Sequence, residues 1–108
     1  MVEWNEEFEE KARKMLEDKD YRKELLEPLW EKEEENGSKI DNGKIAVDDY
    51  EDFAGQCLAD IFDGIPGPSG DEIGEQKSKT SGGKGNLDFS QVIDEMEFAI
   101  KALLNRYK

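Results

Sequence analysis

Carboxylates are the chemically most conspicuous side chains of this sequence, because aspartate and glutamate account for 28 of its 108 residues and histidine is absent. Without an imidazole base, the common serine and cysteine nucleophile pairs cannot be assembled, and zinc sites that use histidine are excluded. Cys57 is the only cysteine, and its place on the apolar face of a predicted helix indicates a small core residue. We therefore predict a protein that is not an enzyme, with no catalytic residue, no metal and no cofactor.

Adjacent carboxylates and a glycine-rich tract are the remaining candidates for chemistry. Acid–base catalysis requires carboxylates in a partly dry pocket that separates their pKa values, whereas the runs 33–35 and 48–49 are strongly hydrophilic and indicate a solvated face. The tract 81–85 is superficially similar to a nucleotide-binding loop. Such a loop needs serine or threonine after Gly-Lys, and here Gly85 follows Lys84, so the tract is predicted to be a flexible connection.

The spacing of apolar residues predicts the elements that would carry these side chains. Helices are expected over residues 4–17, 21–35, 49–63 and 88–106, with a short extended piece at 44–47 and a long Gly-rich loop at 64–86. The predicted fold class is all-α, a small bundle of about three to four short helices in a single domain, 1–108. No internal repeat is evident.

Local signals give the expected ends of these helices. Asp20 and Asp48 are candidate N-caps of the second and third helices, and Asp88 with Gln91 forms the capping-box pattern of the last helix. Pro28 should kink or break the second helix near its middle. The stretch before Asp20 fits either a turn or a continuous helix, so the connection between the first two helices is left open.

The segment 40–53 has the residue order of a calcium-binding loop. Gly43 is followed by the apolar Ile45, the acidic Asp49 and the aromatic Tyr50. This order resembles the second half of an EF-hand loop, in which a glycine makes the sharp turn, an apolar residue pairs with a sister loop and an acidic residue closes the loop. The resemblance implies a regulatory, calcium-responsive module.

The first half of that loop departs from the EF-hand pattern. Ser38 and Ile40 stand where the first two side-chain oxygen ligands would be, and Ile40 cannot ligate a cation. Asp49 is also shorter than the glutamate that usually closes the loop. No second loop is predicted to pair with the first. The alternative interpretation is a joint between two helices in which the turn 41–43 serves only backbone geometry.

The net charge of −13 is concentrated in one part of the chain. The first 63 residues contain 21 acidic and nine basic side chains, a net charge of −12. Such a field repels nucleic acid and anionic membranes and speeds encounter with basic surfaces. We therefore predict no direct contact with nucleic acid or membrane. The same charge could also serve solubility alone.

The composition as a whole predicts a binding or inhibitor protein that covers a basic surface of another protein, such as an enzyme that holds nucleic acid with lysine and arginine. In size, charge and helicity the chain is similar to immunity proteins against nuclease toxins and to phage-encoded inhibitors of bacterial defence systems, some of which mimic DNA. The predicted contact residues, chosen by charge density, are Glu6, Glu10, Glu31, Glu33, Glu34, Glu35, Asp41, Asp48, Asp49 and Asp52.

Two other functions remain open from the sequence. One is the degenerate EF-hand-like regulatory module described above. The other is an assembly subunit, for example a homodimer, that pairs through the apolar stripes of its helices. A single cysteine fits a reducing compartment, so a cytoplasmic location is expected.

Overall fold

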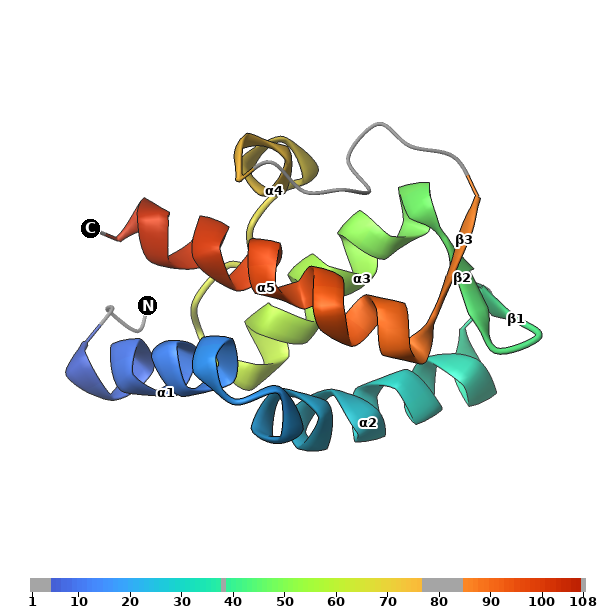
Figure 1. Cartoon of the computed structure of the whole chain (residues 1–108), viewed down its shortest axis with the longest axis horizontal. Coiled ribbons are helices and arrows are strands. Elements are labelled where there is room, and N and C mark those ends of the chain that lie inside the picture. The colour runs from blue at the N-terminus through green and yellow to red at the C-terminus, as the bar shows by residue number, and fades with distance from the viewer. Residues whose placement is uncertain (1–4, 38, 77–84, 108) are drawn as a thin grey trace.

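Figure 1 shows the computed structural model, which describes residues 5–37, 39–76 and 85–107. The elements, in chain order, are α1 (Glu6–Glu17), α2 (Lys19–Asn36), β1 (Ile40–Asp41), β2 (Lys44–Ala46), α3 (Val47–Ile61), α4 (Gly70–Glu75), β3 (Asn86–Asp88) and α5 (Phe89–Arg106). Three parts of the sequence predictions lie outside the described residues: residue 4, where the first helix was expected to begin, Ser38, and residues 81–84 of the glycine-rich tract.

The fold is mostly helical, as predicted, but the expectation of a purely all-α fold is wrong. A three-stranded antiparallel sheet in the order β1-β2-β3 closes one end of the molecule. Its strands have only two or three residues each, which is too short for a period-two pattern to be recognised. The extended piece expected at 44–47 is present as β2. Within the described residues, no helix has the length and apolarity of a membrane span.

The first two helices are separate, and the boundary lies at Asp18. The Asp18 carboxylate accepts a hydrogen bond from the backbone N–H of Tyr21 at 3.1 Å, so Asp18, and not Asp20, is the N-cap of α2. The helix then runs through Pro28 without a break. Here tertiary packing outweighs the local cost of proline, since residues on both sides of Pro28 are buried in the core.

The starts of the two later long helices differ in their caps. The reciprocal capping box of α5 is confirmed, with Gln91 N–H to Asp88 Oδ1 at 2.9 Å and Asp88 N–H to Gln91 Oε1 at 3.0 Å. The N-cap predicted at Asp48 is wrong. Helix α3 begins at Val47 because β2 runs directly into it, and Ala46 caps it without a side-chain hydrogen bond.

The segment 64–86, expected to be one long loop, contains the short helix α4 and the first residue of β3. Ser69 and Glu72 cap α4 reciprocally, each backbone N–H donating to the other side chain at 3.2 Å. Ile73, 1% exposed, anchors this helix in the core. The sequence did not predict this helix, because it has only six residues and the segment around it is rich in glycine and proline.

The β2–β3 pair joins two related halves. Ile45 lies opposite Leu87 in the ladder, and each of these buried residues is preceded by a glycine with positive φ, Gly43 at 74° and Gly85 at 111°. Each strand leads directly into a long helix, α3 or α5. The expectation that no second loop pairs with the first is therefore wrong, and Ile45 has a partner as in paired EF-hand loops.

The same shift of 42 residues, from Ile45 to Leu87, relates the buried faces of the two following helices. Five of the six buried residues of α3 correspond to buried residues of α5: Tyr50 to Val92, Phe53 to Glu95, Ala54 to Met96, Cys57 to Ala99 and Leu58 to Ile100, whereas Val47 corresponds to the half-buried Phe89. The repeat is one of burial and not of residue identity. It therefore could not be recognised in the sequence.

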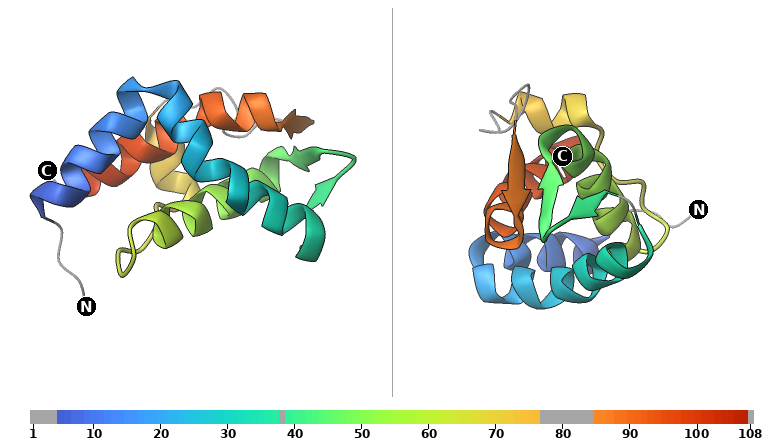
Figure 2. Two further views of the ribbon diagram at one scale, coloured as in Figure 1. Left: turned by 90° about the horizontal axis from the view of Figure 1, so that it is seen from below. Right: turned by 90° about the vertical axis from the view of Figure 1, so that its right-hand side faces the viewer.

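Helix α5 is the centre of the fold and contacts α1, α2, α3 and α4 (Figures 1 and 2). The aromatic ring of Trp30 on α2 lies between the two halves, 5.7 Å from the ring of Phe53 and 5.2 Å from that of Phe89. Cys57 is buried in this core, as predicted, and burial raises the pKa of its thiol. The helices thus form one continuous core around α5.

Tyr50→Phe is expected to raise the free energy of unfolding by about 1 kcal/mol, because it removes a buried polar group that lacks a partner. Tyr50 is 0% exposed, and its hydroxyl has no hydrogen-bond partner within the described part of the chain. Burial, and then the nearby Glu95 carboxylate, raise the pKa of this hydroxyl. Urea unfolding would measure the change, with half-buried Tyr21→Phe as the control. A clear loss of stability in Tyr50→Phe would contradict the prediction.

Candidate partner-binding surface

The outer face of α2 carries a line of carboxylates, which we call the α2 acidic stripe. It consists of five exposed residues: Asp20, Glu24, Glu27, Glu31 and Glu34. Their spacing alternates between four and three positions, which places them on one face of a helix. At a rise of 1.5 Å per residue the stripe is about 21 Å long. Helix α2 forms an edge of the molecule (Figures 1 and 2), so the stripe faces solvent.

The carboxylates of the α2 acidic stripe form no ion pair with another described residue. The ion pairs between described residues are Arg13–Glu9, Lys19–Asp94, Lys101–Glu97 and Arg106–Glu72. None of them includes a residue of the stripe. The carboxylates therefore remain available to a cation from outside the chain.

The C-terminal turn of α2 places negative charge where a helix disfavours it. Glu33, Glu34 and Glu35 lie in this turn, which contains no basic residue. The C-terminal pole of a helix carries a partial negative charge, and each unfavourable carboxylate there costs about 0.3–1 kcal/mol. Sequence features that reduce stability in this way tend to occur at functional sites.

Eight of the ten predicted contact residues belong to elements that meet at one end of the molecule. Figure 1 shows the end of α2, the β1–β2 hairpin and the start of α3 at the same end of the molecule, which we call the sheet end. The predicted residues at this end are Glu31, Glu33, Glu34, Glu35, Asp41, Asp48, Asp49 and Asp52. Glu33 and Asp49 are half-buried and the other six are exposed. Glu6 and Glu10 are exposed on α1, at the opposite end.

Sequence reasoning missed three members of the α2 acidic stripe: Asp20, Glu24 and Glu27. It chose runs of adjacent carboxylates, and neighbours in a helix point to different sides. The alternating spacing of four and three from Asp20 to Glu34 is the signal that could have found them.

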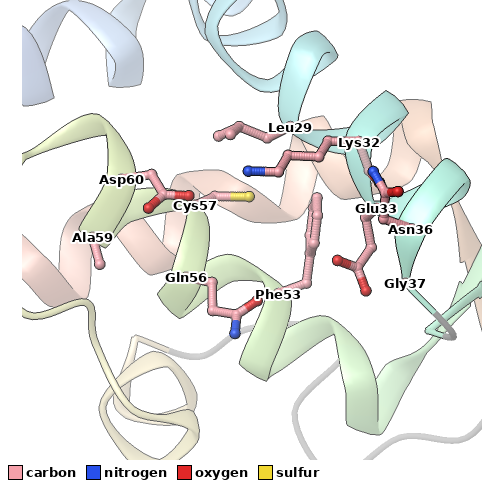
Figure 3. A pocket seen from close by; sticks show the side chains of 10 residues that line it. All are labelled: Leu29, Lys32, Glu33, Asn36, Gly37, Phe53, Gln56, Cys57, Ala59 and Asp60. Atoms are coloured by element: carbon pink, nitrogen blue, oxygen red, sulfur yellow. The ribbon is translucent and has the colours of Figure 1, made fainter.

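A groove lies between α2 and α3 (Figure 3), and its α2 lining belongs to the face of that helix opposite to the stripe. It has a volume of about 370 Å³. Its apolar floor is formed by Leu29, Phe53 and Cys57, and charged side chains at its rim are Lys32, Glu33 and Asp60. Besides burial, the charges of Asp60 and Glu33 raise the pKa of the Cys57 thiol.

The described residues of the two segments that meet at the β2–β3 ladder do not provide the side chains that a calcium site needs. In the first loop, Ile40 and Ala46 occupy ligand positions and offer no side-chain oxygen. In the second loop, Asp88 and Gln91 hold each other's backbone N–H groups in the capping box of α5. Among the described residues, no group of three or more histidine, cysteine, aspartate or glutamate side chains could hold a metal ion.

Calcium is therefore expected to produce no saturable binding signal at millimolar concentration. Isothermal titration of the protein with calcium in the presence of magnesium measures this directly. The variant Asp49→Glu restores the usual closing residue of the first loop. It is also expected to give no saturable heat of calcium binding, because Ile40 still offers no side-chain oxygen. Saturable heat in the wild-type protein would contradict the prediction and support a calcium-responsive module.

The surface combines a line of carboxylates with an apolar groove. Among the described residues, the groups whose pKa is clearly shifted do not include a nucleophile beside a base. Tyr50 and Cys57 are buried, with pKa values raised by burial. Glu72 and Arg106 are paired with each other. No protein-family model, curated protein or solved structure matches this chain.

Proposed function

We propose that this chain is an acidic binding protein that covers a basic surface of another protein, and that α2 carries the contact. The observation that supports this most strongly is the α2 acidic stripe, five exposed carboxylates that form no ion pair within the part of the chain that the structure describes. The stripe continues into a helix terminus that disfavours negative charge. A surface that served solubility alone would not need this concentration on one helix face.

The chemistry of the stripe indicates the class of partner. Its carboxylates follow one another at about 5 Å along the helix axis, a spacing of the same order as the rise of roughly 3.4 Å along the duplex axis per phosphate of one DNA strand. A surface of lysine and arginine that holds nucleic acid would therefore also fit this helix. Binding would block access to nucleic acid on such an enzyme, by occlusion, as immunity proteins and DNA-mimicking inhibitors do.

Capture from a lysate with tagged proteins tests the proposal. The variant Glu27→Gln/Glu31→Gln/Glu34→Gln neutralises the middle and end of the stripe. The matched control, Glu6→Gln/Glu7→Gln/Glu10→Gln, makes the same change in net charge on α1. We expect the wild-type protein and the α1 variant to retain a basic protein at about 50 mM salt and to release it at about 500 mM, because salt screens exposed charges.

The α2 variant is expected to lose this partner at both salt concentrations. Its melting temperature should not fall, since the substitutions remove repulsion between like charges and with the helix terminus. Equal retention of the same partner by all three proteins would contradict the proposal.

A second candidate function is a regulatory module that works without calcium, and the pairing of Ile45 with Leu87 favours it. In that case the partner would remain bound at about 500 mM salt, because apolar contacts are not screened.

A further inference from the structure

We propose that Asn42, in the turn between β1 and β2, is a site of self-catalysed modification, at which the backbone nitrogen of Gly43 closes a succinimide ring on the Asn42 side chain. Water then opens the ring to aspartate or isoaspartate. The sequence contains a second Asn-Gly pair, Asn36 and Gly37, and the structure distinguishes the two pairs. This inference does not depend on the proposed function.

The reaction needs water and no other partner. The Gly43 nitrogen gives up its proton and attacks the side-chain carbonyl carbon of Asn42, and the side-chain nitrogen leaves as ammonia. Hydrolysis of the bond from the Gly43 nitrogen to the side-chain carbonyl carbon gives aspartate. Hydrolysis of the bond from the Gly43 nitrogen to the main-chain carbonyl carbon gives isoaspartate, whose backbone is longer by a methylene group. Either product replaces a neutral amide with a carboxylate.

The β1–β2 turn leaves the reacting groups accessible. Asp41 pairs with Lys44, and φ is positive at both central residues, 54° at Asn42 and 74° at Gly43, which defines a type I′ turn. Both central residues are exposed, and the turn projects from the sheet end of the molecule (Figure 1). A Cβ added to Gly43 would meet nothing within 4 Å, and among the described residues the Gly43 N–H forms no backbone hydrogen bond. Because β1 has only two residues, the turn can open to the geometry of ring closure while the core stays folded.

The second Asn-Gly pair, at the C-terminal end of α2, is held in place. The Gly37 N–H donates to the Glu33 carbonyl oxygen at 2.8 Å, and the Asn36 side-chain amide donates to the Lys32 carbonyl oxygen at 3.3 Å. These hydrogen bonds must break before a ring can close. The Glu33 carboxylate also fills the space beside Gly37 that a Cβ would occupy, and its negative charge opposes loss of the proton from the Gly37 nitrogen. The structure therefore favours reaction at Asn42 over reaction at Asn36.

The charges around Asn42 act in the opposite direction to that of Glu33. Asn42 lies in a hollow whose charged lining residues are Lys39, Asp41 and Lys44. These side chains carry two positive charges and one negative charge, in a chain whose net charge is −13. Ring closure passes through an anionic nitrogen and then an oxyanion, and nearby positive charge stabilises both.

The test incubates the full chain in mildly alkaline buffer, folded and unfolded in urea, and follows conversion by mass spectrometry. Tryptic peptides 33–39 and 40–44 contain Asn36 and Asn42 respectively, so the two sites are measured separately. In the folded chain we expect Asn42 to convert about tenfold or more faster than Asn36, because two hydrogen bonds hold the second pair. In urea the two rates should converge, because both sites are then unfolded Asn-Gly pairs.

The control variant Asn42→Gly removes the reacting side chain and keeps a sequence suited to a type I′ turn, so its peptide 40–44 should show no mass change. A mass change there, or conversion of Asn36 as fast as that of Asn42 in the folded chain, would overturn the proposal. Absence of conversion at Asn42 in the folded chain, under conditions in which the unfolded chain reacts, would also overturn it. A rate difference of the same size in urea would overturn it as well, because the selectivity would then come from the local sequence and not from the fold.

Discussion

Trp30→Ala is expected to lower the free energy of unfolding by about 3–5 kcal/mol, the usual cost of removing a buried tryptophan. Trp30 is 5% exposed, and its ring contacts Phe53 of α3 and Phe89 of α5. These two aromatic residues belong to different halves of the fold. The substitution therefore leaves a cavity where α2 joins both halves, and aromatic contacts are lost together with buried area.

Urea or thermal unfolding followed by circular dichroism would measure this loss. Glu27→Ala, an exposed position on the same helix, is the control and should change stability by less than about 0.5 kcal/mol. The loss expected for Trp30→Ala is a large part of the 5–15 kcal/mol typical of a small domain. A loss below about 1 kcal/mol would show that Trp30 does not join the two halves.

Arg106→Met is expected to lower the free energy of unfolding by about 2 kcal/mol, because charge-assisted hydrogen bonds are stronger than neutral ones. The Arg106 guanidinium donates to both carboxylate oxygens of Glu72, at 3.0 and 2.5 Å. It also donates to the carbonyl oxygens of Pro66 at 2.7 Å and of Gly67 at 3.0 Å. One side chain thus connects the end of α5 to α4 and to the segment before it.

The same substitution should change how stability depends on pH. The hydrogen bond from Arg106 is the main cause that holds the pKa of Glu72 below its ordinary value. Because the folded pKa lies below the unfolded one, the pair stabilises the protein above the ordinary glutamate pKa of about 4.3. This contribution is lost as the pH falls through the folded pKa.

The difference in stability between wild type and Arg106→Met should therefore be largest near neutral pH and shrink in acid. Thermal unfolding at about pH 6 and about pH 3, on either side of the ordinary glutamate pKa, measures it. Lys101→Met is the matched control, because Lys101 forms a surface ion pair of 3.8 Å with Glu97 and lies 5.5 Å from the ring centroid of Phe98 on the same helix, and such exposed contacts contribute little. A difference that does not change with pH would contradict this account of Glu72.

Local signals in the sequence predicted local structure. The capping box of Asp88 and Gln91 was confirmed because all its atoms come from four consecutive residues. The start of α3 was missed because it depends on β2, whose strand ends at Ala46. The pairing of Ile45 with Leu87 was also not predicted, because no sequence pattern in either short strand indicates which distant strand it pairs with.

The candidate surface was predicted in part for a similar reason. Runs of acidic residues identified the sheet end, where Glu34 and Glu35 lie. The stripe requires knowledge of which residues share a face of α2, and the exposed positions Asp20 and Glu24 do not stand out as a run. The groove requires the packing of α2 against α3, which only the structure provides.

The most direct test of the central claim is the Kd of the captured partner measured as a function of salt, for the wild-type protein and for Glu27→Gln/Glu31→Gln/Glu34→Gln. If the α2 acidic stripe binds a basic surface, the wild-type Kd rises steeply between about 50 and about 500 mM salt, and the variant binds more weakly with a shallower dependence. An identical Kd and an identical salt dependence for both proteins would show that the stripe is not the binding surface.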